Sequence, residues 1–206
     1  MNAPFDRPRA PLIVGIGGTQ RPSSSSELAA RYALAIAAQA GARVQMFDGP
    51  SLSLPLYNPS DVSRDVRAVA LVEALREADG IILAAPAYHG GISGLIKNAL
   101  DYTEDMKGDD RVYFDERAVG TIACAGGWQA AGATLASLRS VVHSLRGWNT
   151  PLGVMINTSV KVFDGAACLD ADVERNLAIM ARQVVSFALR GRAGQPTPVA
   201  QSKALA

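Results

Sequence analysis

Threonine, arginine and four serines follow the first apolar segment of the chain, in the order GTQRPSSSS at residues 18–26. Hydroxyl groups are neutral hydrogen-bond donors, and an arginine adds a cation whose planar group donates several hydrogen bonds in fixed directions. A helical pattern begins at the serines, and the first turn of a helix carries unpaired N–H groups and the positive end of the helix dipole. Together these groups predict an anion site that suits one phosphate monoester.

The serines also allow a simpler interpretation, in which Ser25 or Ser26 caps the helix and the rest of the segment is a solvated loop. A cap needs only one hydroxyl. That interpretation leaves Thr19, Arg21 and the other serines unexplained, so we favour the anion site.

Two other nucleotide-binding motifs fit less well. A G-x-x-x-x-G-K-[ST] loop needs a Gly-Lys pair, and the sequence contains none. In the dinucleotide pattern G-x-G-x-x-G, Gln20 stands where the third glycine belongs. Asp48, at the end of the second apolar segment, could imitate the ribose-binding acid of that pattern. Dinucleotide binding is therefore weakened as an interpretation and not eliminated.

A second group of candidate residues follows the third apolar segment, in the order PAYHGG at 86–91. Pro86 predicts the end of a strand, because its nitrogen cannot donate to the ladder. The two glycines allow a flat ligand to approach the backbone, with Tyr88 and His89 at the same edge. Alternatively, Tyr88 is an aromatic residue at the edge of the core, and His89 is an exposed loop residue of which only the backbone matters.

The sequence offers few groups for metal binding or nucleophilic catalysis. His89 and His143 are the only histidines, and no Cys/His cluster has the spacing of a zinc site. Cys124 and Cys168 lie far apart, and Cys124 falls in an apparent strand, where a thiol packs as a small hydrophobe. We therefore predict no metal site and name no catalytic acid or base.

Five short apolar segments precede or separate these groups, at 11–17, 43–48, 80–86, 118–125 and 152–157. Such nearly continuous runs are typical of strands buried on both faces of a parallel sheet. Apolar residues recur at helical spacing in 91–104, 130–146 and 173–187. Because right-handed crossovers place helices on both faces, we predict an α/β fold: a flavodoxin-like three-layer sandwich with a five-stranded parallel sheet in the order 2-1-3-4-5.

Composition and charge limit the remaining classes of function. The 206 residues predict one domain over 1–192, followed by a flexible tail at 193–206, where helical periodicity ends. The net charge of +1 argues against a general nucleic-acid-binding surface. No apolar run approaches the roughly 20 residues of a membrane span. We expect no membrane partner and a cytoplasmic location.

The segments GTQRPSSSS at 18–26 and P-x-Y-x-x-x-x-S-G-x-x-K-N-x-L-D at 86–101 together resemble the NAD(P)H-dependent FMN reductase family of flavodoxin-like proteins. Thr19 replaces the usual serine of the family, and Arg21, Ser24 and Ser26 match its motif. Residues 125–147 are similar to the family's glycine-rich segment after the fourth strand, with Trp128 where serine is common. The resemblance covers residues 12–150.

The resemblance implies FMN as cofactor, NAD(P)H as reductant and a role for each matching residue. The FMN phosphate would be held by Thr19, Arg21, Ser24 and Ser26. The flavin ring would lie along Pro86, Ala87, Tyr88 and His89, and the pocket would be closed opposite them by Gly126, Gly127 and Trp128. Trp128 would either contact the ligand or pack at a subunit interface.

The implied reaction is hydride transfer from reduced nicotinamide to FMN, which needs no protein acid or base. Reduced FMN would leave for a partner monooxygenase, or stay bound and reduce a quinone, an azo compound or a metal ion. Two alternatives remain: a flavodoxin-like electron carrier, disfavoured by the near-neutral charge and Arg21, and a binding module for another phosphate ligand. The family also implies a homodimer or homotetramer.

The segment 102–119 is a polar insertion, which we expect to be a solvated connector. In a second interpretation its aromatic residues Tyr102, Tyr113 and Phe114 cover the flavin of a neighbouring subunit.

Overall fold

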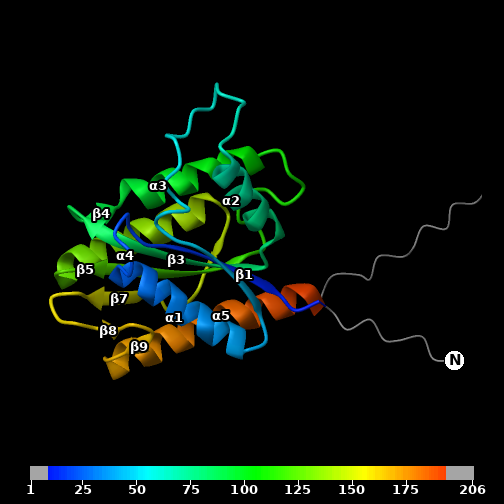
Figure 1. Cartoon of the computed structure of the whole chain (residues 1–206). Helices are drawn as coiled ribbons and strands as arrows, with labels where there is room; N and C mark the ends of the chain where they lie inside the picture. Colours follow the sequence, from blue (N-terminus) through cyan, green and yellow to red (C-terminus); the bar gives the residue numbers. More distant parts are fainter. Residues whose placement is uncertain (1–8, 194–206) are drawn as a thin grey trace, which may run out of the picture.

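The structure, a computed structural model, describes residues 9–193. Its sheet is built on four parallel strands in the spatial order β2-β1-β3-β5, namely β2 (Arg43–Phe47), β1 (Leu12–Gly17), β3 (Gly80–Tyr88) and β5 (Ala118–Ala125). Two short strands, β6 (Trp148–Asn149) and β7 (Val154–Asn157), both pair in parallel with β5 and share the outer position. With β6 and β7 counted as one fifth strand, the predicted α/β fold and strand order are confirmed (Figure 1).

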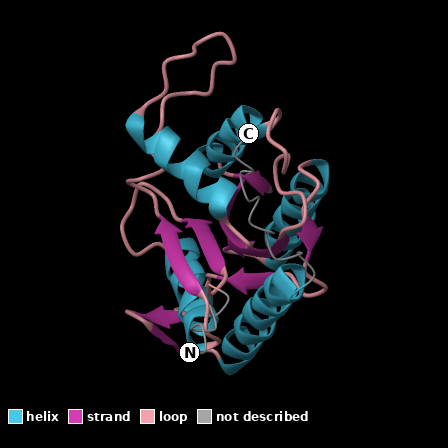
Figure 2. Cartoon of the chain, turned by 90° about the vertical axis from the view of Figure 1, so that its right-hand side faces the viewer, coloured by secondary structure: helices cyan, strands magenta, loops and turns pink. Residues whose placement is uncertain are grey.

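Helices lie on both faces of this sheet (Figure 2). The described residues form α1 (Ser25–Gln39), α2 (Val66–Glu77), α3 (Gly94–Asp101), α4 (Trp128–Ser144) and α5 (Ala171–Ala193). Buried side chains of α1 and α5 share one hydrophobic cluster with the sheet, and those of α2, α3 and α4 share another. The molecule is therefore a sandwich of three layers, as the sequence predicts.

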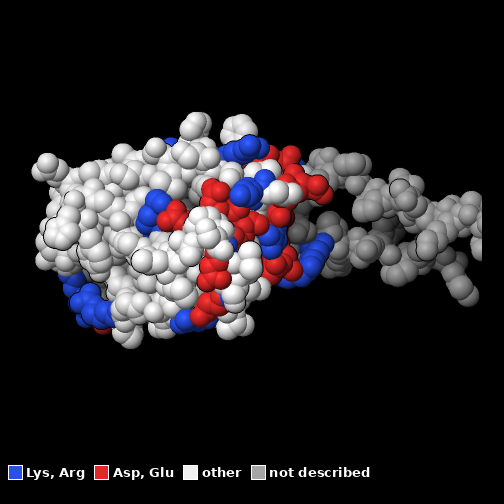
Figure 3. Space-filling model, turned by 90° about the horizontal axis from the view of Figure 1, so that it is seen from above, with Lys and Arg blue, Asp and Glu red and all other residues white. Residues whose placement is uncertain are grey.

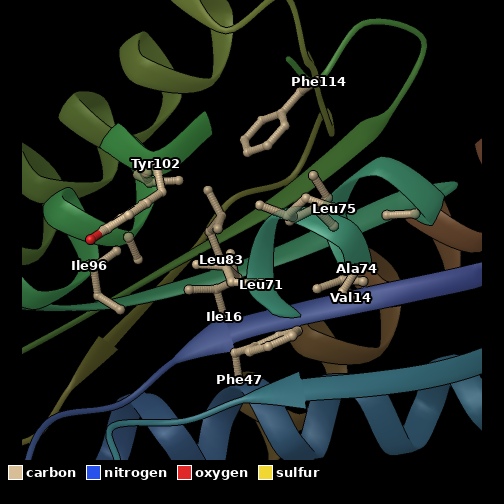
Figure 4. Close-up of a cluster of buried hydrophobic side chains, with 14 of the residues drawn as sticks. Val14, Ile16, Phe47, Leu71, Ala74, Leu75, Leu83, Ile96, Tyr102 and Phe114 are labelled. Atoms are coloured by element: carbon tan, nitrogen blue, oxygen red, sulfur yellow. The ribbon is translucent and has the colours of Figure 1, made fainter. Parts of the chain in front are cut away.

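The second of these clusters shows how the chain closes its core (Figure 4). Leu71 and Leu75 of α2 lie over Val14 of β1 and Leu83 of β3, and none of the four is exposed to solvent. Each such side chain contributes about 2 kcal/mol by burial. Because the opposite face is covered by α1 and α5, the central strands are apolar at nearly every position.

The end of β3 differs from the prediction. The strand does not stop at Pro86 but continues to Tyr88, and its last two residues pair in antiparallel fashion with β4 (Gly91–Ile92). The helix expected from residue 91 therefore begins at Gly94, where Ser93 accepts a hydrogen bond from the N–H of Ile96. The hairpin of β8 (Phe163–Asp164) and β9 (Ala167–Cys168) has no counterpart in the prediction.

The segment 102–119 is not the solvated connector that its composition predicts. It begins as a 3-10 helix, η1 (Tyr102–Met106), and Tyr102 and Phe114 are 3% and 0% exposed within the core of their own chain. Those two aromatic rings therefore do not cover a neighbouring flavin. Arg117 is also fully buried, and its guanidinium donates hydrogen bonds to the carbonyls of Arg76 and Ala78 at the end of α2.

The described residues bear on the expectations about membrane spans, metal sites and the chain ends. No helix of residues 9–193 is long and apolar enough to cross a membrane. Within the same residues, no group of three or more His, Cys, Asp or Glu side chains could hold a metal ion. The predicted tail lies outside the described residues, apart from Ala193, and the single domain over 1–192 stays a prediction.

Candidate functional site

Close backbone packing holds the loop between β1 and α1 in place. Gly18 has a φ of +123°, a conformation that favours glycine. A Cβ atom added to Gly49 would lie 1.7 Å from the carbonyl oxygen of Thr19, so the loop rests directly on the chain after β2. A Cβ atom on Gly17 would lie 3.1 Å from the carbonyl oxygen of Ser26, which shows how closely the start of α1 approaches β1.

The serines open α1 and form its cap. The N-cap is Ser24, whose Oγ accepts the N–H of Glu27 at 3.4 Å, so the alternative cap at Ser25 or Ser26 is wrong. The hydroxyls of Ser24 and Ser26 lie 3.5 Å apart, and the two residues are 2% and 1% exposed. The first turn of α1 therefore presents two buried hydroxyls together with its unpaired N–H groups.

Thr19 and Arg21 lie at the rim of the same loop. The Oγ of Thr19 accepts the backbone N–H of Arg21 at 3.0 Å, which closes a tight turn. The side chain of Arg21 is exposed and forms no hydrogen bond or ion pair with any other described residue. Its guanidinium is therefore available to an anion in this loop.

A pocket of about 170 Å³ lies between this loop and the ends of β3, β5 and β7. It is lined by Thr19, Arg21, Ser24, Ser25, Ser26, Pro86, Ala87, Tyr88, Cys124, Ala125, Gly126 and Thr158. Every predicted binding residue except His89, Gly127 and Trp128 lines it. Thr158 is absent from the prediction, although its place directly after β7, at the carboxyl edge of the sheet, was a usable signal.

Tyr88 separates this pocket from a second hollow. The second hollow, of about 250 Å³, is lined by Thr19, Gln20, Arg21, Tyr88, Ser93, Gly94 and Leu95. Tyr88 is 55% exposed, so it is not a residue at the edge of the core. His89 and Gly90 follow with φ values of +54° and +77° and form the tight turn between β3 and β4.

Gly126, Gly127 and Trp128 lie at the start of α4. Gly127 is the N-cap residue of this helix. Because it has no side chain, no side-chain cap accepts a hydrogen bond from the first N–H groups of α4. A Cβ atom on either glycine would meet nothing within 4 Å, and Trp128 is 59% exposed. The start of α4 is therefore exposed, and Trp128 does not pack into the core of its own chain.

The lining of the pocket is largely uncharged, with one cation, Arg21, at its rim. No carboxylate or imidazole lines it. Burial raises the pKa of the Cys124 thiol to about 12, so this sulfur stays protonated and is a poor nucleophile near neutral pH. On the face drawn in Figure 3, charged side chains gather toward one end of the molecule, and the opposite end is largely uncharged.

These groups fit a phosphate monoester better than a diphosphate or a metal. Two buried hydroxyls, the N–H groups of α1 and one free guanidinium can surround a single anion. Away from the β1–α1 loop, the lining residues are mostly apolar or offer backbone groups, with the hydroxyl of Thr158 as an exception, and such a lining suits the edge of a flat ring.

Comparison with known proteins agrees with this chemistry. The sequence pattern of the NADPH-dependent FMN reductase family matches residues 11–161. The chain is 31% identical over 160 residues to an NADPH azoreductase of Bacillus sp. (strain OY1-2), a match that covers 77% of this chain and 83% of that enzyme. It is 35% identical over 120 residues to an FMN-dependent NADPH-azoreductase of Staphylococcus aureus (strain USA300), covering 57% and 60% of the two chains.

Solved structures support the fold. A flavodoxin, WrbA-like protein from Agrobacterium tumefaciens superposes with a TM-score of 0.62 at 18% identity, covering 88% of this chain and 99% of that one. At that identity the likeness concerns the flavodoxin-like fold alone. The family match extends over most of the chain and includes both predicted ligand-binding segments. The chain therefore belongs to the NADPH-dependent FMN reductase family.

Proposed function

We propose that the chain is an FMN-dependent NAD(P)H oxidoreductase that holds the phosphate of FMN between the β1–α1 loop and the ends of β3, β5 and β7. The pocket beside the start of α1 carries this proposal, because it combines buried hydroxyls, unpaired N–H groups and a free guanidinium with no competing carboxylate. In this assignment the phosphate is bound by Thr19, Arg21, Ser24 and Ser26.

The remaining candidate residues position the flavin ring. Pro86, Ala87 and Tyr88 line the pocket, and His89 follows them in the tight turn between β3 and β4. Gly126 lines the pocket, Gly127 and Trp128 follow it at the start of α4, and in this assignment the three residues close the opposite side. Neither glycine has a side chain that would hinder close approach, and the exposed indole of Trp128 offers a stacking surface.

FMN bound in this pocket would supply the two-electron chemistry that links NAD(P)H to a second substrate. The chain contributes binding and alignment, because no carboxylate or imidazole lines the pocket. Unpaired N–H groups at the start of α4 lie where they can stabilise negative charge on the ring. Tyr88 and Trp128 are more than half exposed, so a flavin ring between them would stay open to a second planar molecule.

We propose a small aromatic acceptor, such as an azo compound, with FMN retained between turnovers. The azoreductase names of two relatives support this choice. Release of reduced FMN to a partner monooxygenase is the competing outcome. Two exposed aromatic residues beside the pocket also favour a homodimer that covers them, and light scattering of the purified protein tests that assembly.

The decisive experiment compares FMN with riboflavin, which lacks the phosphate. Arg21→Ala is expected to raise the Kd for FMN at least about tenfold, because a charge-assisted hydrogen bond is worth about 1.5–3 kcal/mol. Riboflavin binding is expected to change little. Arg175→Ala is the control, because Arg175 pairs with Asp172 on the surface of α5.

A second measurement identifies the acceptor. The protein loaded with FMN is passed over a desalting column and then assayed for NADPH and NADH oxidation with an azo dye. Retained flavin together with dye reduction supports the proposal. Loss of the flavin, with turnover only when free FMN is added, favours the flavin-releasing reductase.

A further inference from the structure

A chain of charged side chains lies directly behind the hydroxyl loop. Glu27, in the first turn of α1, is 8% exposed, and its Oε2 accepts the backbone N–H of Ser23 at 3.0 Å. Its Oε1 pairs with Nε of Arg31 at 2.9 Å. Arg31 also pairs with Oδ2 of Asp48 at 2.7 Å, directly after β2. The chain of contacts thus links the loop to the neighbouring strand.

The bond to Ser23 differs from the usual cap of a helix. In a capping box, the acid three residues into the helix accepts the N–H of the cap residue itself. Here the cap is Ser24, and Glu27 accepts the N–H of the residue before it. Ser23 has a φ of +56°, a left-handed conformation that is strained for serine. Glu27 therefore fixes a backbone conformation that would otherwise relax.

The same carboxylate would oppose an anion in the pocket. Glu27 is three residues from Ser24, whose hydroxyl lines the pocket, and a buried charge is poorly screened by water. Arg31 balances that charge. It is shared with Asp48, so its removal would leave two carboxylates beside the phosphate loop without this cation.

We propose that Glu27 and Arg31 are positioning residues for the phosphate of FMN. Glu27 sets the backbone of the hydroxyl loop, and Arg31 neutralises Glu27 so that its charge does not repel the phosphate. Neither residue lines the pocket, so both act through the loop. This inference rests on the proposed binding of the FMN phosphate at the start of α1.

Four variants separate the two roles. Glu27→Ala removes the bond to Ser23 and is expected to raise the Kd for FMN about tenfold. Glu27→Gln keeps an oxygen for that bond and removes the charge, so FMN binding should stay within about twofold of the unchanged protein. Arg31→Ala exposes the carboxylates and should raise the Kd for FMN about tenfold. Adding Glu27→Gln to Arg31→Ala should restore most of that loss.

The readout is the ratio of the Kd values for riboflavin and FMN, measured by quenching of flavin fluorescence. A purely structural role would weaken both ligands and leave this ratio unchanged. Arg175→Ala removes an exposed arginine from a surface pair on α5 and serves as the matched control, with no change expected in either Kd. If Glu27→Ala does not fold, Arg31→Ala and the double variant Glu27→Gln/Arg31→Ala still test the electrostatic role.

The outcomes distinguish this inference from the proposed function. If the unchanged protein binds riboflavin as tightly as FMN, the phosphate site is wrong and the inference falls with it. If the unchanged protein prefers FMN and Arg31→Ala keeps the same preference, the inference alone is overturned. The same holds if Glu27→Gln fails to restore the preference to Arg31→Ala. Restored preference in the double variant supports the inference.

Discussion

Gly49 packs against the β1–α1 loop, and replacing it with alanine is a sharp test of how that loop is held. The added Cβ would lie 1.7 Å from the carbonyl oxygen of Thr19, far inside the 3.0 Å below which real Cβ contacts essentially never occur. Both atoms belong to backbone or are fixed to it, so no side-chain rotation relieves the clash. The loop must move away by about 1 Å or more.

Two consequences of that movement can be measured. Overpacking of this kind costs about 1–3 kcal/mol, so the free energy of unfolding should fall by that amount in urea denaturation. A shift of about 1 Å in groups that bind the phosphate is enough to weaken binding about tenfold or more, so the Kd for FMN should rise at least that much. Riboflavin should be affected less, because the contacts proposed for its ring lie on β3 and β5.

Gly108→Ala is the matched control. A Cβ atom on Gly108 would meet no atom within 4 Å, so this variant should keep both stability and FMN binding. If Gly49→Ala were as stable as Gly108→Ala and bound FMN as tightly as the unchanged protein, the close support of the loop by the chain after β2 would be refuted.

Three further predictions follow from buried or paired groups. Because burial raises the pKa of Cys124 to about 12, its thiol should resist alkylation at pH 8 until the protein unfolds; rapid alkylation in the folded state would contradict this. Arg117→Met should lower the free energy of unfolding by about 3 kcal/mol in urea, because four backbone carbonyls lose their donor, and a loss below about 1 kcal/mol would show that Arg117 is not needed to cap α2. The hydrogen bond from Tyr32 to Glu174, and to a lesser degree burial, raises the Tyr32 pKa from 10.0 to about 12. The stability that this contact gives the folded protein should therefore be present below pH 10 and be lost between pH 10 and 12. Tyr32→Phe should remove that pH dependence from thermal unfolding, and an unchanged profile would count against the contact.

The sequence is sufficient to predict the parts of the site that depend on residue type and order. Thr19, Arg21 and the serines follow a buried strand and open a helix, so local chemistry and the rule for α/β sheets place them together. Tyr88 ends β3, Gly126 follows the neighbouring strand β5, and both reach the same pocket for the same reason.

Other features depend on contacts that no local pattern reveals. Arg117 lies in a charged segment, and only the fold brings the carbonyls of α2 to its guanidinium. The pairing of Glu27 with the N–H of Ser23 depends on a left-handed residue that the sequence does not mark.

A crystal structure of the protein soaked with FMN tests the central claim most directly. We expect phosphate density within hydrogen-bonding distance of Ser24 and Ser26, with the Arg21 guanidinium turned onto it and the flavin ring beside Tyr88. Flavin density with its phosphate directed away from the start of α1, or bound elsewhere on the molecule, would contradict it.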